Sequence, residues 1–293
     1  MREFAPPREM RAWSRAERIR GHRIGFVPTM GFLHEGHLRL VDRAKEQADR
    51  VVLSIFVNPL QFGPREDFAA YPRDLERDRR LAKERGVDCL FVPVADAMYP
   101  MEPLVRVHPG PMADTLEGAV RPGHFVGVLT VVAKLLHMVE PDVAVFGRKD
   151  FQQAMLVRRM VADLDFACEV EIAPTVRELD GLALSSRNVY LKGDDRRAAL
   201  ALSRALRAVE QAWRGGEADP RALERRGMET LKTPGVTPEY FTLVDELLRP
   251  VARVDAKTVA VVAAKVGGTR LIDNVVLGEG MATDVSVRTT AKD

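Results

Sequence analysis

The sequence predicts an α/β protein: a Rossmann-like, doubly wound parallel sheet followed by a smaller α+β C-terminal domain. Two observations support the sheet. Apolar runs alternate with helical patterns up to about residue 172, and residues 51–57 (VVLSIFV) are continuously apolar, which is typical of a central parallel strand covered on both faces. A third observation supports the second domain, because from Asp194 onward predicted helices are followed by predicted strands instead of alternating with them.

The first strand, helix and second strand are expected to form a βαβ unit. Residues 24–27 (IGFV) give the first strand, which we expect Pro28 to end. A helix is predicted from about Gly36, because the apolar side chains after it recur at helical spacing. The run 51–57 then gives the second strand and completes the unit.

The same alternation continues through the first domain, with helices over residues 74–85, 125–139 and 150–164 and strands over residues 88–92, 143–146 and 168–172. Pro174, Gly181 and the polar run 185–188 then interrupt the apolar pattern. We therefore predict domains over residues 1–175 and 176–293. In the second domain, helices are expected near residues 196–213 and 221–231, and strands near 241–244, 259–264 and 271–276.

The composition is that of an ordinary globular protein of 293 residues, with 46% hydrophobic and 29% charged side chains. The formal net charge of +2 creates no field that would recruit nucleic acid or an anionic membrane, so neither is expected as a partner. The N-terminus is too charged for a signal peptide. Two cysteines, Cys89 and Cys168, fit a reducing compartment better than a disulfide-stapled fold. A cytoplasmic protein is expected.

The turn between the first strand and its helix is predicted to bind phosphate. Gly31 and Gly36 let the backbone approach a ligand closely, and the unpaired N–H groups and partial positive charge of a helix start suit an anion. His34 and His37 can add donors from one side. The histidine pair has two alternative interpretations, a structural role and a zinc site. The zinc site is disfavoured because the HExxH spacing and a nearby third ligand are both missing.

Polar side chains that could orient a small acid follow further strands, and the carboxyl ends of strands in an open α/β sheet meet in one crevice. Asn58 and Gln61 offer two amides after the second strand, although a plain turn would also explain Asn58. Gln153 is expected about one helical turn beyond Lys149, and a surface glutamine is the alternative.

Charged and hydroxyl side chains in two other segments suit a nucleotide. Lys149 is expected beside a helix start, where its ammonium meets a phosphate, and Asp150 can cap the helix or meet ribose or magnesium. A solvated charge cluster is the alternative. Residues 185–188 (SSRN) provide two hydroxyls and a guanidinium that suit a triphosphate, and a plain linker is the alternative.

Six ordered motifs carry a resemblance to a known family. They are PTMGFLHEGH (28–37), FVNPLQFG (56–63), RPGHF (121–125), GRKDFQQ (147–153), LSSRN (184–188) and TRLIDN (269–274). Together they resemble the pantothenate synthetases, or pantoate–β-alanine ligases, of the cytidylyltransferase-like nucleotide-binding superfamily. The resemblance covers nearly the whole chain. One position departs from it, because Arg148 stands where many members carry glutamate in GEKD.

The resemblance implies an ATP- and Mg²⁺-dependent ligase that forms pantothenate through pantoyl adenylate, acting as a cytoplasmic homodimer. It implies that His37 and His34 are catalytic, with Lys149 and Arg187 completing the charged set. It places pantoate on Gln61 and Gln153, and β-alanine on Gln61. The ATP contacts that it implies are Met30, Gly31, Phe32, Leu33, His34, Glu35, Gly36, His37, Gly147, Arg148, Lys149, Asp150, Val176, Leu184, Ser185, Ser186 and Arg187.

Two other functions stay open from the residues alone. A nucleotidyltransferase acting on a phosphate acceptor would share the histidine motif, but it would leave Gln61 and Gln153 without an evident purpose. A catalytically silent nucleotide-binding module would bind ATP without releasing pyrophosphate. The dependence of AMP release on β-alanine separates the ligase from both.

Overall fold

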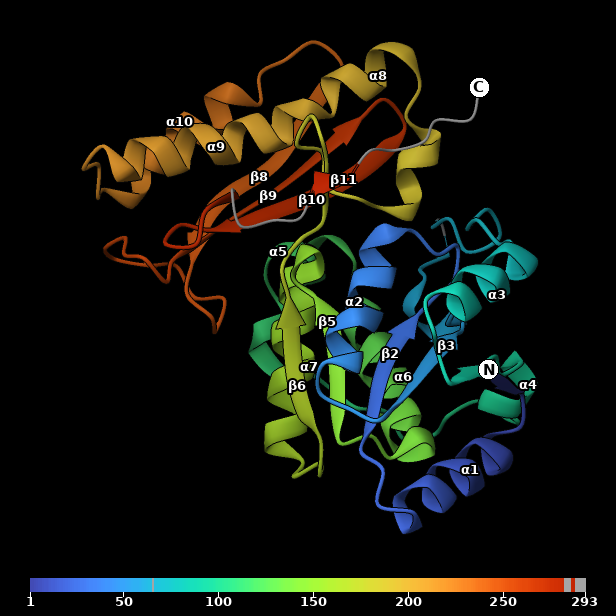
Figure 1. Ribbon diagram of the computed structural model, residues 1–293. Helices are drawn as coiled ribbons and strands as arrows, with labels where there is room; N and C mark the ends of the chain where they lie inside the picture. The colour runs from blue at the N-terminus through green and yellow to red at the C-terminus, as the bar shows by residue number, and fades with distance from the viewer. Residues whose placement is uncertain (65, 282–285, 288–293) are drawn as a thin grey trace. The chain divides into compact units, whose positions relative to one another are not determined.

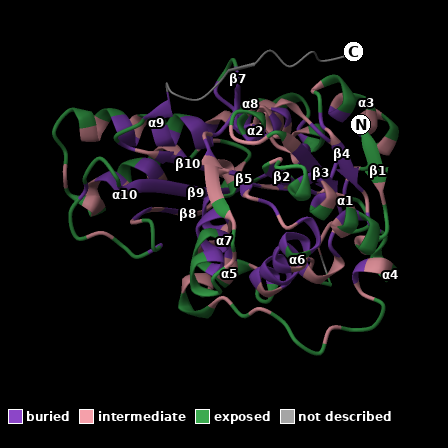
Figure 2. Ribbon diagram, turned by 60° about the horizontal axis from the view of Figure 1, so that its bottom comes forward, coloured by how far each residue is buried: buried purple, intermediate pink, exposed green. Residues whose placement is uncertain are grey.

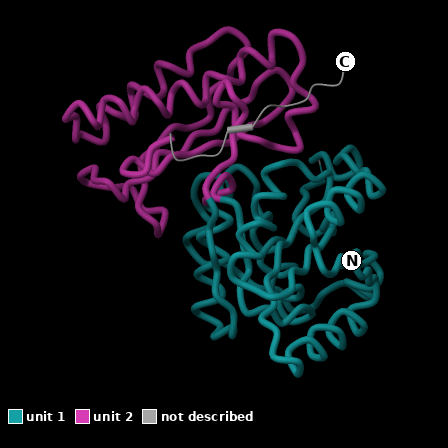
Figure 3. Tube along the Cα trace, in the orientation of Figure 1, with its two compact units in different colours: residues 1–147, 152–173 teal, residues 148–151, 174–293 magenta. Residues whose placement is uncertain are grey.

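The computed structural model describes residues 1–64, 66–281 and 286–287. The chain divides into two compact units (Figure 3). Unit 1 consists of residues 1–147 and 152–173, and unit 2 consists of residues 148–151 and 174–293. The short segment 148–151 therefore belongs with the C-terminal part of the chain, which the sequence did not predict.

Unit 1 is built on a six-stranded parallel sheet with the strand order β1-β4-β3-β2-β5-β6 (Figure 1). From β2 the chain adds β3 and β4 on one side, where the N-terminal β1 forms the edge, and then β5 and β6 on the other side, so the strand order reverses at β2. Ligands of open α/β sheets bind at such a reversal, beyond the carboxyl ends of the strands. The strands are β1 (Arg2–Phe4), β2 (Ile24–Thr29), β3 (Arg50–Ile55), β4 (Cys89–Phe91), β5 (Val143–Gly147) and β6 (Glu169–Ala173).

Helices cover this sheet, which confirms the predicted α/β class. Alternate residues of β3 enter the core beneath α2, whereas Ser54 points away from that core and is fully buried. The helix α6 is buried almost all round (Figure 2), as its continuous apolar sequence requires. The helices are α1 (Pro7–Ile19), α2 (Glu35–Lys45), α3 (Leu75–Glu84), α4 (Ala95–Met98), α5 (Leu116–Val120), α6 (His124–Val139) and α7 (Phe151–Asp163), with short 3₁₀ turns η1 (Pro59–Gln61), η2 (Gly110–Ala113) and η3 (Arg148–Asp150).

The prediction that Pro28 ends the first strand is wrong, because β2 continues through it to Thr29. Pro28 pairs in register with Ser54 of β3, whereas the registered pairs between β2 and β5 stop at Phe26. The absence of an N–H group at Pro28 therefore costs no hydrogen bond in the ladder between β2 and β5. The short helices α4 and α5 were also not predicted, because neither is long enough to show a helical period.

Unit 2 has the predicted α+β architecture. Its antiparallel sheet has the order β10-β9-β8, and Figure 1 shows α9 and α10 on one face of it. A single helix over 196–213 is wrong, because the chain forms two helices that meet at Ala199. The elements are β7 (Arg177–Glu178), η4 (Ser186–Tyr190), α8 (Gly193–Ala198), α9 (Leu200–Arg214), α10 (Pro220–Thr230), β8 (Val236–Val244), β9 (Val259–Val266), β10 (Thr269–Val276) and β11 (Ser286–Val287).

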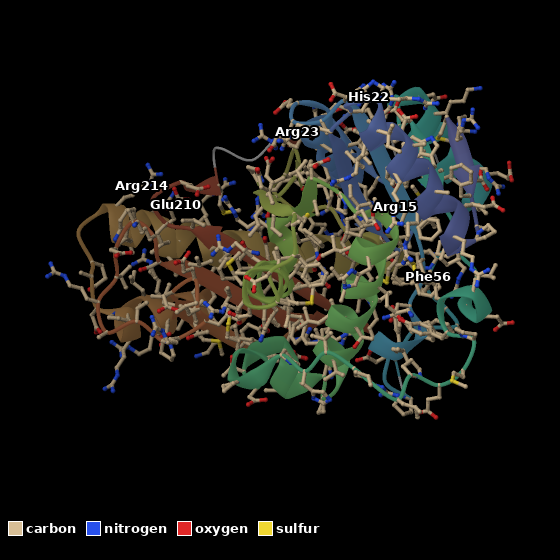
Figure 4. All side chains as sticks on the ribbon, turned by 90° about the horizontal axis from the view of Figure 1, so that it is seen from below. Arg15, His22, Arg23, Phe56, Glu210 and Arg214 are labelled. Carbon is tan, nitrogen blue, oxygen red and sulfur yellow. The ribbon has the colours of Figure 1, made fainter. Side chains whose placement is uncertain are left out.

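The segment that follows β10 is hydrogen-bonded to α9 at Met281. The carboxylate of Glu210 accepts a hydrogen bond from the N–H of Met281 at 3.2 Å and pairs with Arg214 at 2.9 Å. Figure 4 shows Glu210 and Arg214 next to each other on this helix. Met281 itself is buried in the core of unit 2, so the segment from the end of β10 to Met281 is part of that core.

Candidate active site

The loop between β2 and α2 has a left-handed backbone conformation. The φ angles of Gly31 and Phe32 are 82° and 51°. A Cβ at position 31 would lie 2.8 Å from Cγ2 of Ile55 and 3.0 Å from Oδ2 of Asp78. Packing within the protein therefore requires glycine at position 31, in addition to the ligand approach that the sequence predicts.

The buried carboxylate of Asp78 on α3 holds this loop. Its two oxygens accept hydrogen bonds from the N–H groups of Phe32 and Leu33, both at 2.7 Å. The neighbouring Arg77 donates to the carbonyl oxygen of Leu33 at 2.7 Å and lies over the Phe32 ring. Burial raises the pKa of Asp78, although the two N–H groups favour its charged form. Sequence reasoning missed Asp78, because it stands in a charged helix and in none of the quoted motifs.

His34 and His37 lie against each other at the start of α2. Their rings stack with centroids 4.0 Å apart and an angle of 29° between the planes. The backbone N–H of His34 donates to Nδ1 of His37 at 3.4 Å. Because Nδ1 accepts, a neutral His37 carries its proton on Nε2, which makes Nε2 the donating nitrogen of this ring.

Backbone donors at the start of α2 complete this arrangement. The N–H groups of His37 and Leu38 bind the carbonyl oxygen of His34 at 2.9 and 3.1 Å. The N–H groups of Glu35 and Gly36 precede the first helical bond, so helix geometry leaves them for an anion. The structure thus places two imidazoles and two backbone donors together at the predicted phosphate site.

The amide loop after β3 reaches the histidine loop through the side chain of Gln61. Nε2 of Gln61 lies 3.1 Å from the sulfur of Met30. The Gln61 oxygen accepts from Nδ2 of Asn58 at 3.1 Å, and the Asn58 oxygen accepts from the Tyr99 hydroxyl at 2.9 Å. Asn58 and Gln61 are 1% and 8% exposed, so the turn is a buried polar cluster and not a surface loop.

The RPGHF motif supports this cluster from α6. Nδ1 of His124 donates to the carbonyl oxygen of Gln61 at 2.8 Å, and Nε2 of His124 accepts from Arg121 at 2.9 Å. Arg121 in turn pairs with the carboxylate of Glu66. Burial, followed by the charge of Arg121, lowers the pKa of His124 to about 4, so this imidazole is neutral at pH 7. The motif was recognised in the sequence, but these roles could not be assigned from it.

Two adjacent glutamines on α7 have different surroundings. The buried Gln152 uses its amide fully, accepting from the N–H of Glu117 and donating to two carbonyl oxygens. The half-buried Gln153 makes no side-chain hydrogen bond to the part of the chain that the structure describes. Gln153 is therefore the glutamine whose amide is available to a substrate.

In unit 2, a second group of predicted residues begins with the turn η3. The Lys149 ammonium lies 3.4 Å from the carboxylate of Asp150, which is half exposed. Arg148, the residue that departs from the family motif, makes a close ion pair with Glu279. Its charge is therefore compensated within unit 2.

The remaining predicted ATP contacts lie in a hairpin and in the turn η4 that follows it, in the same unit. The N–H of Leu184 donates to the carbonyl oxygen of Val176 at 2.9 Å, which brings the two ends of the hairpin together. Ser185 caps η4, because its hydroxyl accepts from the N–H of Arg187 at 3.2 Å. Ser186 is buried, whereas Ser185 and Arg187 are half-buried.

The described parts of the chain contain neither a cluster of three potential metal ligands nor a helix long and apolar enough to cross a membrane. The predicted residues instead form one group in each unit. Unit 1 brings together the histidine loop, Asn58, Gln61 and the α2 N-terminus, and unit 2 contains Lys149, Asp150, the hairpin and Arg187 in η4.

Comparison with known proteins agrees with the motifs. Residues 3–276 match the family model described as pantoate-beta-alanine ligase. This chain belongs to the pantoate–β-alanine ligase family. The resemblance seen in the sequence is thereby confirmed, and the protein is a ligase.

Individual relatives match over nearly their whole length. The pantothenate synthetase of Heliobacterium modesticaldum is 52% identical over 279 residues, covering 94% of this chain and 99% of the relative. A crystal structure of the enzyme from Thermus thermophilus has a TM-score of 0.90 at 50% identity, covering 94% and 99% of the two chains. The ligase from Francisella tularensis, solved with an ATP compound and β-alanine, has a TM-score of 0.79 at 34% identity, covering 96% and 99%.

Proposed function

We propose that this ligase joins pantoate to β-alanine in two steps with a pantoyl-adenylate intermediate. In the first step a pantoate carboxylate oxygen attacks the α-phosphorus of ATP, and the bond from that phosphorus to the bridging oxygen of pyrophosphate breaks. In the second step the β-alanine amine attacks the acyl carbon, loses a proton and displaces AMP. Neither step requires a nucleophilic side chain.

Charge is the main obstacle in the first step, because both reactants are anions. In unit 1, we assign phosphate binding to Nε2 of His37, to His34 and to the N–H groups at the start of α2. In unit 2, Lys149 and Arg187 supply positive charge. Donors that are fixed in place before the reaction stabilise charge at a transition state better than water does.

The contact between Gln61 and Met30 is the observation that carries this proposal. It attaches an acid-orienting amide to the loop that bears the phosphate donors, at 3.1 Å. A carboxylate held by Gln61 would therefore be delivered next to the proposed phosphate site. We assign pantoate to Gln61 and Gln153, and the incoming β-alanine to Gln61.

Magnesium fits the site as part of the ATP complex. Mg²⁺ is usually held by one or two carboxylates together with substrate phosphates. Asp150, which is half exposed beside Lys149, offers one such carboxylate. When bound, the ion would neutralise phosphate charge, which assists departure of pyrophosphate.

The proposed ATP contacts are divided between the two units, so we propose that the domain formed by residues 176–293 closes on the first domain when ATP binds. Closure would also protect the acyl adenylate from water. From the family resemblance we further propose a cytoplasmic homodimer. Light scattering after size exclusion would test the dimer, since a monomer mass would contradict it.

Product release tests the reaction. With ATP and Mg²⁺, we expect pyrophosphate release to require pantoate, and multiple-turnover AMP release to require β-alanine as well. AMP release that does not depend on β-alanine would favour the nucleotidyltransferase alternative. ATP binding without pyrophosphate release under either condition would favour the silent module.

A further inference from the structure

The TRLIDN motif at residues 269–274 has no role in the proposed reaction, yet its last residue reaches the segment that bears Lys149. Nδ2 of Asn274 donates one hydrogen bond to the carbonyl oxygen of Arg148 at 2.9 Å and another to that of Lys149 at 3.0 Å. Asn274 is 3% exposed. Both hydrogens of one buried amide are therefore used to hold η3.

Asn274 is itself fixed from several sides. Its main-chain N–H donates to the Asp273 carboxylate at 2.7 Å, and its main-chain carbonyl oxygen accepts from Arg177 at 3.1 Å. Arg177 and Asp273 form a two-pronged ion pair at 2.6 and 2.9 Å, with exposures of 2% and 4%. An amide held by such a pair has little freedom to move, so its two donors have a defined direction.

The same arrangement reaches the second group of ATP residues in unit 2. Arg177 directly follows Val176, and it also donates to the carbonyl oxygen of Gly181 in the turn of the hairpin. The hairpin then returns to Leu184, which pairs with Val176. Asp273 and Asn274 thus connect the Lys149 segment with the hairpin that leads to Arg187.

The chemistry at position 274 requires asparagine. The partners are two carbonyl oxygens, which only accept, so the side chain must donate twice from one nitrogen. Aspartate has the same shape, but it would set a carboxylate oxygen against two carbonyl oxygens in a buried site. Alanine would leave both carbonyl oxygens without this donor.

We propose that Asn274 is a positioning residue that sets the backbone of η3 and thereby aims the Lys149 ammonium at the phosphates of ATP. This inference rests on the proposed role of Lys149 in ATP binding. It gives the TRLIDN motif a function at a distance from the substrate, exerted through main-chain carbonyls.

A double-mutant cycle on ATP affinity tests this proposal. The affinity of an ATP analogue with a methylene group between the α and β phosphates would be measured by calorimetry for wild type, N274D, N274A, K149A and the K149A/N274A double variant. We expect N274A to weaken binding about tenfold and N274D to weaken it more. In the K149A background, N274A should change the dissociation constant by less than about twofold, because its effect acts through Lys149.

Two results would overturn the proposal: wild-type affinity in N274A, or a tenfold loss from N274A that persists in the K149A background. A stability control is Leu243→Ala, which removes a fully buried core side chain from β8, a strand that pairs with β9 and not with β10. It should lower the melting temperature without changing ATP affinity. If N274D does not fold, the N274A arms decide the question.

The proposed function has a separate readout. Absence of pantoate-dependent pyrophosphate release in the wild-type enzyme would refute the two-step reaction. The affinity cycle would still report whether Asn274 acts through Lys149, because it measures binding without turnover.

Discussion

At the scale of single residues, the proposed phosphate site depends on how protons are placed on two imidazoles. The contact from the His34 N–H makes Nδ1 of His37 an acceptor and leaves Nε2 as the donor. The ring of His34 stacks on that of His37 and restricts its rotation. The sequence identified both residues, whereas the tautomer of His37 follows only from the backbone contact.

Removal of one proposed phosphate-binding donor should slow the first step strongly. We expect His37→Ala or Lys149→Ala to lower pantoate-dependent pyrophosphate release by two to three decades, about 3 kcal/mol of transition-state stabilisation. The control is Lys83→Ala, which removes an exposed ammonium group on α3. Gln152→Glu would not serve as a control, because it disturbs a buried amide. Near-normal release in either active-site variant would show that the role assigned to that residue is wrong.

Asp78 should control the loop and not the chemistry itself. In Asp78→Asn an NH₂ group replaces one carboxylate oxygen. This donor would face the buried main-chain N–H group that the oxygen had accepted from. We expect about 1–3 kcal/mol of lost stability and weaker ATP binding. Chemical denaturation and calorimetry measure the two effects. Glu76→Gln, on the exposed side of the same helix, is the matched control. Wild-type ATP affinity in Asp78→Asn would argue against loop control.

Arg148 stands where the motif resemblance leads us to expect glutamate, and in the structure it pairs with Glu279. Arg148→Glu would place a carboxylate opposite Glu279, so we expect ATP affinity to fall about fivefold, roughly 1 kcal/mol. Adding Glu279→Arg should restore most of the loss, because the pair is re-formed with reversed charges. Calorimetry on the four proteins checks this, and the absence of restoration would contradict it.

At the scale of elements, α6 and η1 together support the side-chain amides of Asn58 and Gln61. Gly127 of α6 is essential to this packing, because a Cβ there would lie 2.2 Å from the carbonyl oxygen of Leu60. The same helix supplies His124, and its Gly127 carbonyl oxygen accepts from Asn58 at 3.1 Å. The position of Gln61 therefore depends on a helix that contributes none of the proposed substrate contacts.

His124 should make stability depend on pH between about 4 and 6.5. Its folded-state pKa is about 4, so the unfolded chain binds more protons in this window and stability rises with pH across it. The full effect is on the order of 3 kcal/mol, present above pH 6.5 and lost toward pH 4. His124→Asn keeps a donor but does not titrate, so we expect a shallower slope in urea unfolding between pH 4.5 and 7.

The exposed His137 also lies on α6 and provides the control for His124→Asn. His137→Asn should leave the slope unchanged. An unchanged slope in His124→Asn would contradict the assignment of this pH dependence to His124.

At the scale of the whole molecule, the sequence predicted the α/β class, the strands around the reversal at β2 and the residues of the candidate site. Those features follow from periodicity and from local motifs. Pro28 was misjudged because its effect depends on which neighbouring strand is registered beside it. Asp78 and Asn274 were missed as site residues because their partners are distant in sequence and consist of backbone groups, which no side-chain pattern reveals.

The proposed domain closure would make the reaction depend on both units. If closure is required, an engineered disulfide that holds the two units in an open arrangement should abolish adenylate formation, and reduction should restore it. Retained pyrophosphate release in the oxidised protein would show that closure is unnecessary. The reduced form of the same variant is its own control.

The most direct test of the proposed pantoyl-adenylate mechanism follows one labelled oxygen atom. With pantoate labelled by ¹⁸O in its carboxylate, attack on the α-phosphorus transfers one labelled oxygen to AMP when β-alanine cleaves the adenylate. Mass spectrometry of the AMP formed in a complete reaction should therefore show a gain of about 2 mass units per fully labelled carboxylate, the mass difference of the isotope. AMP without label, formed together with pantothenate, would contradict the pantoyl-adenylate route.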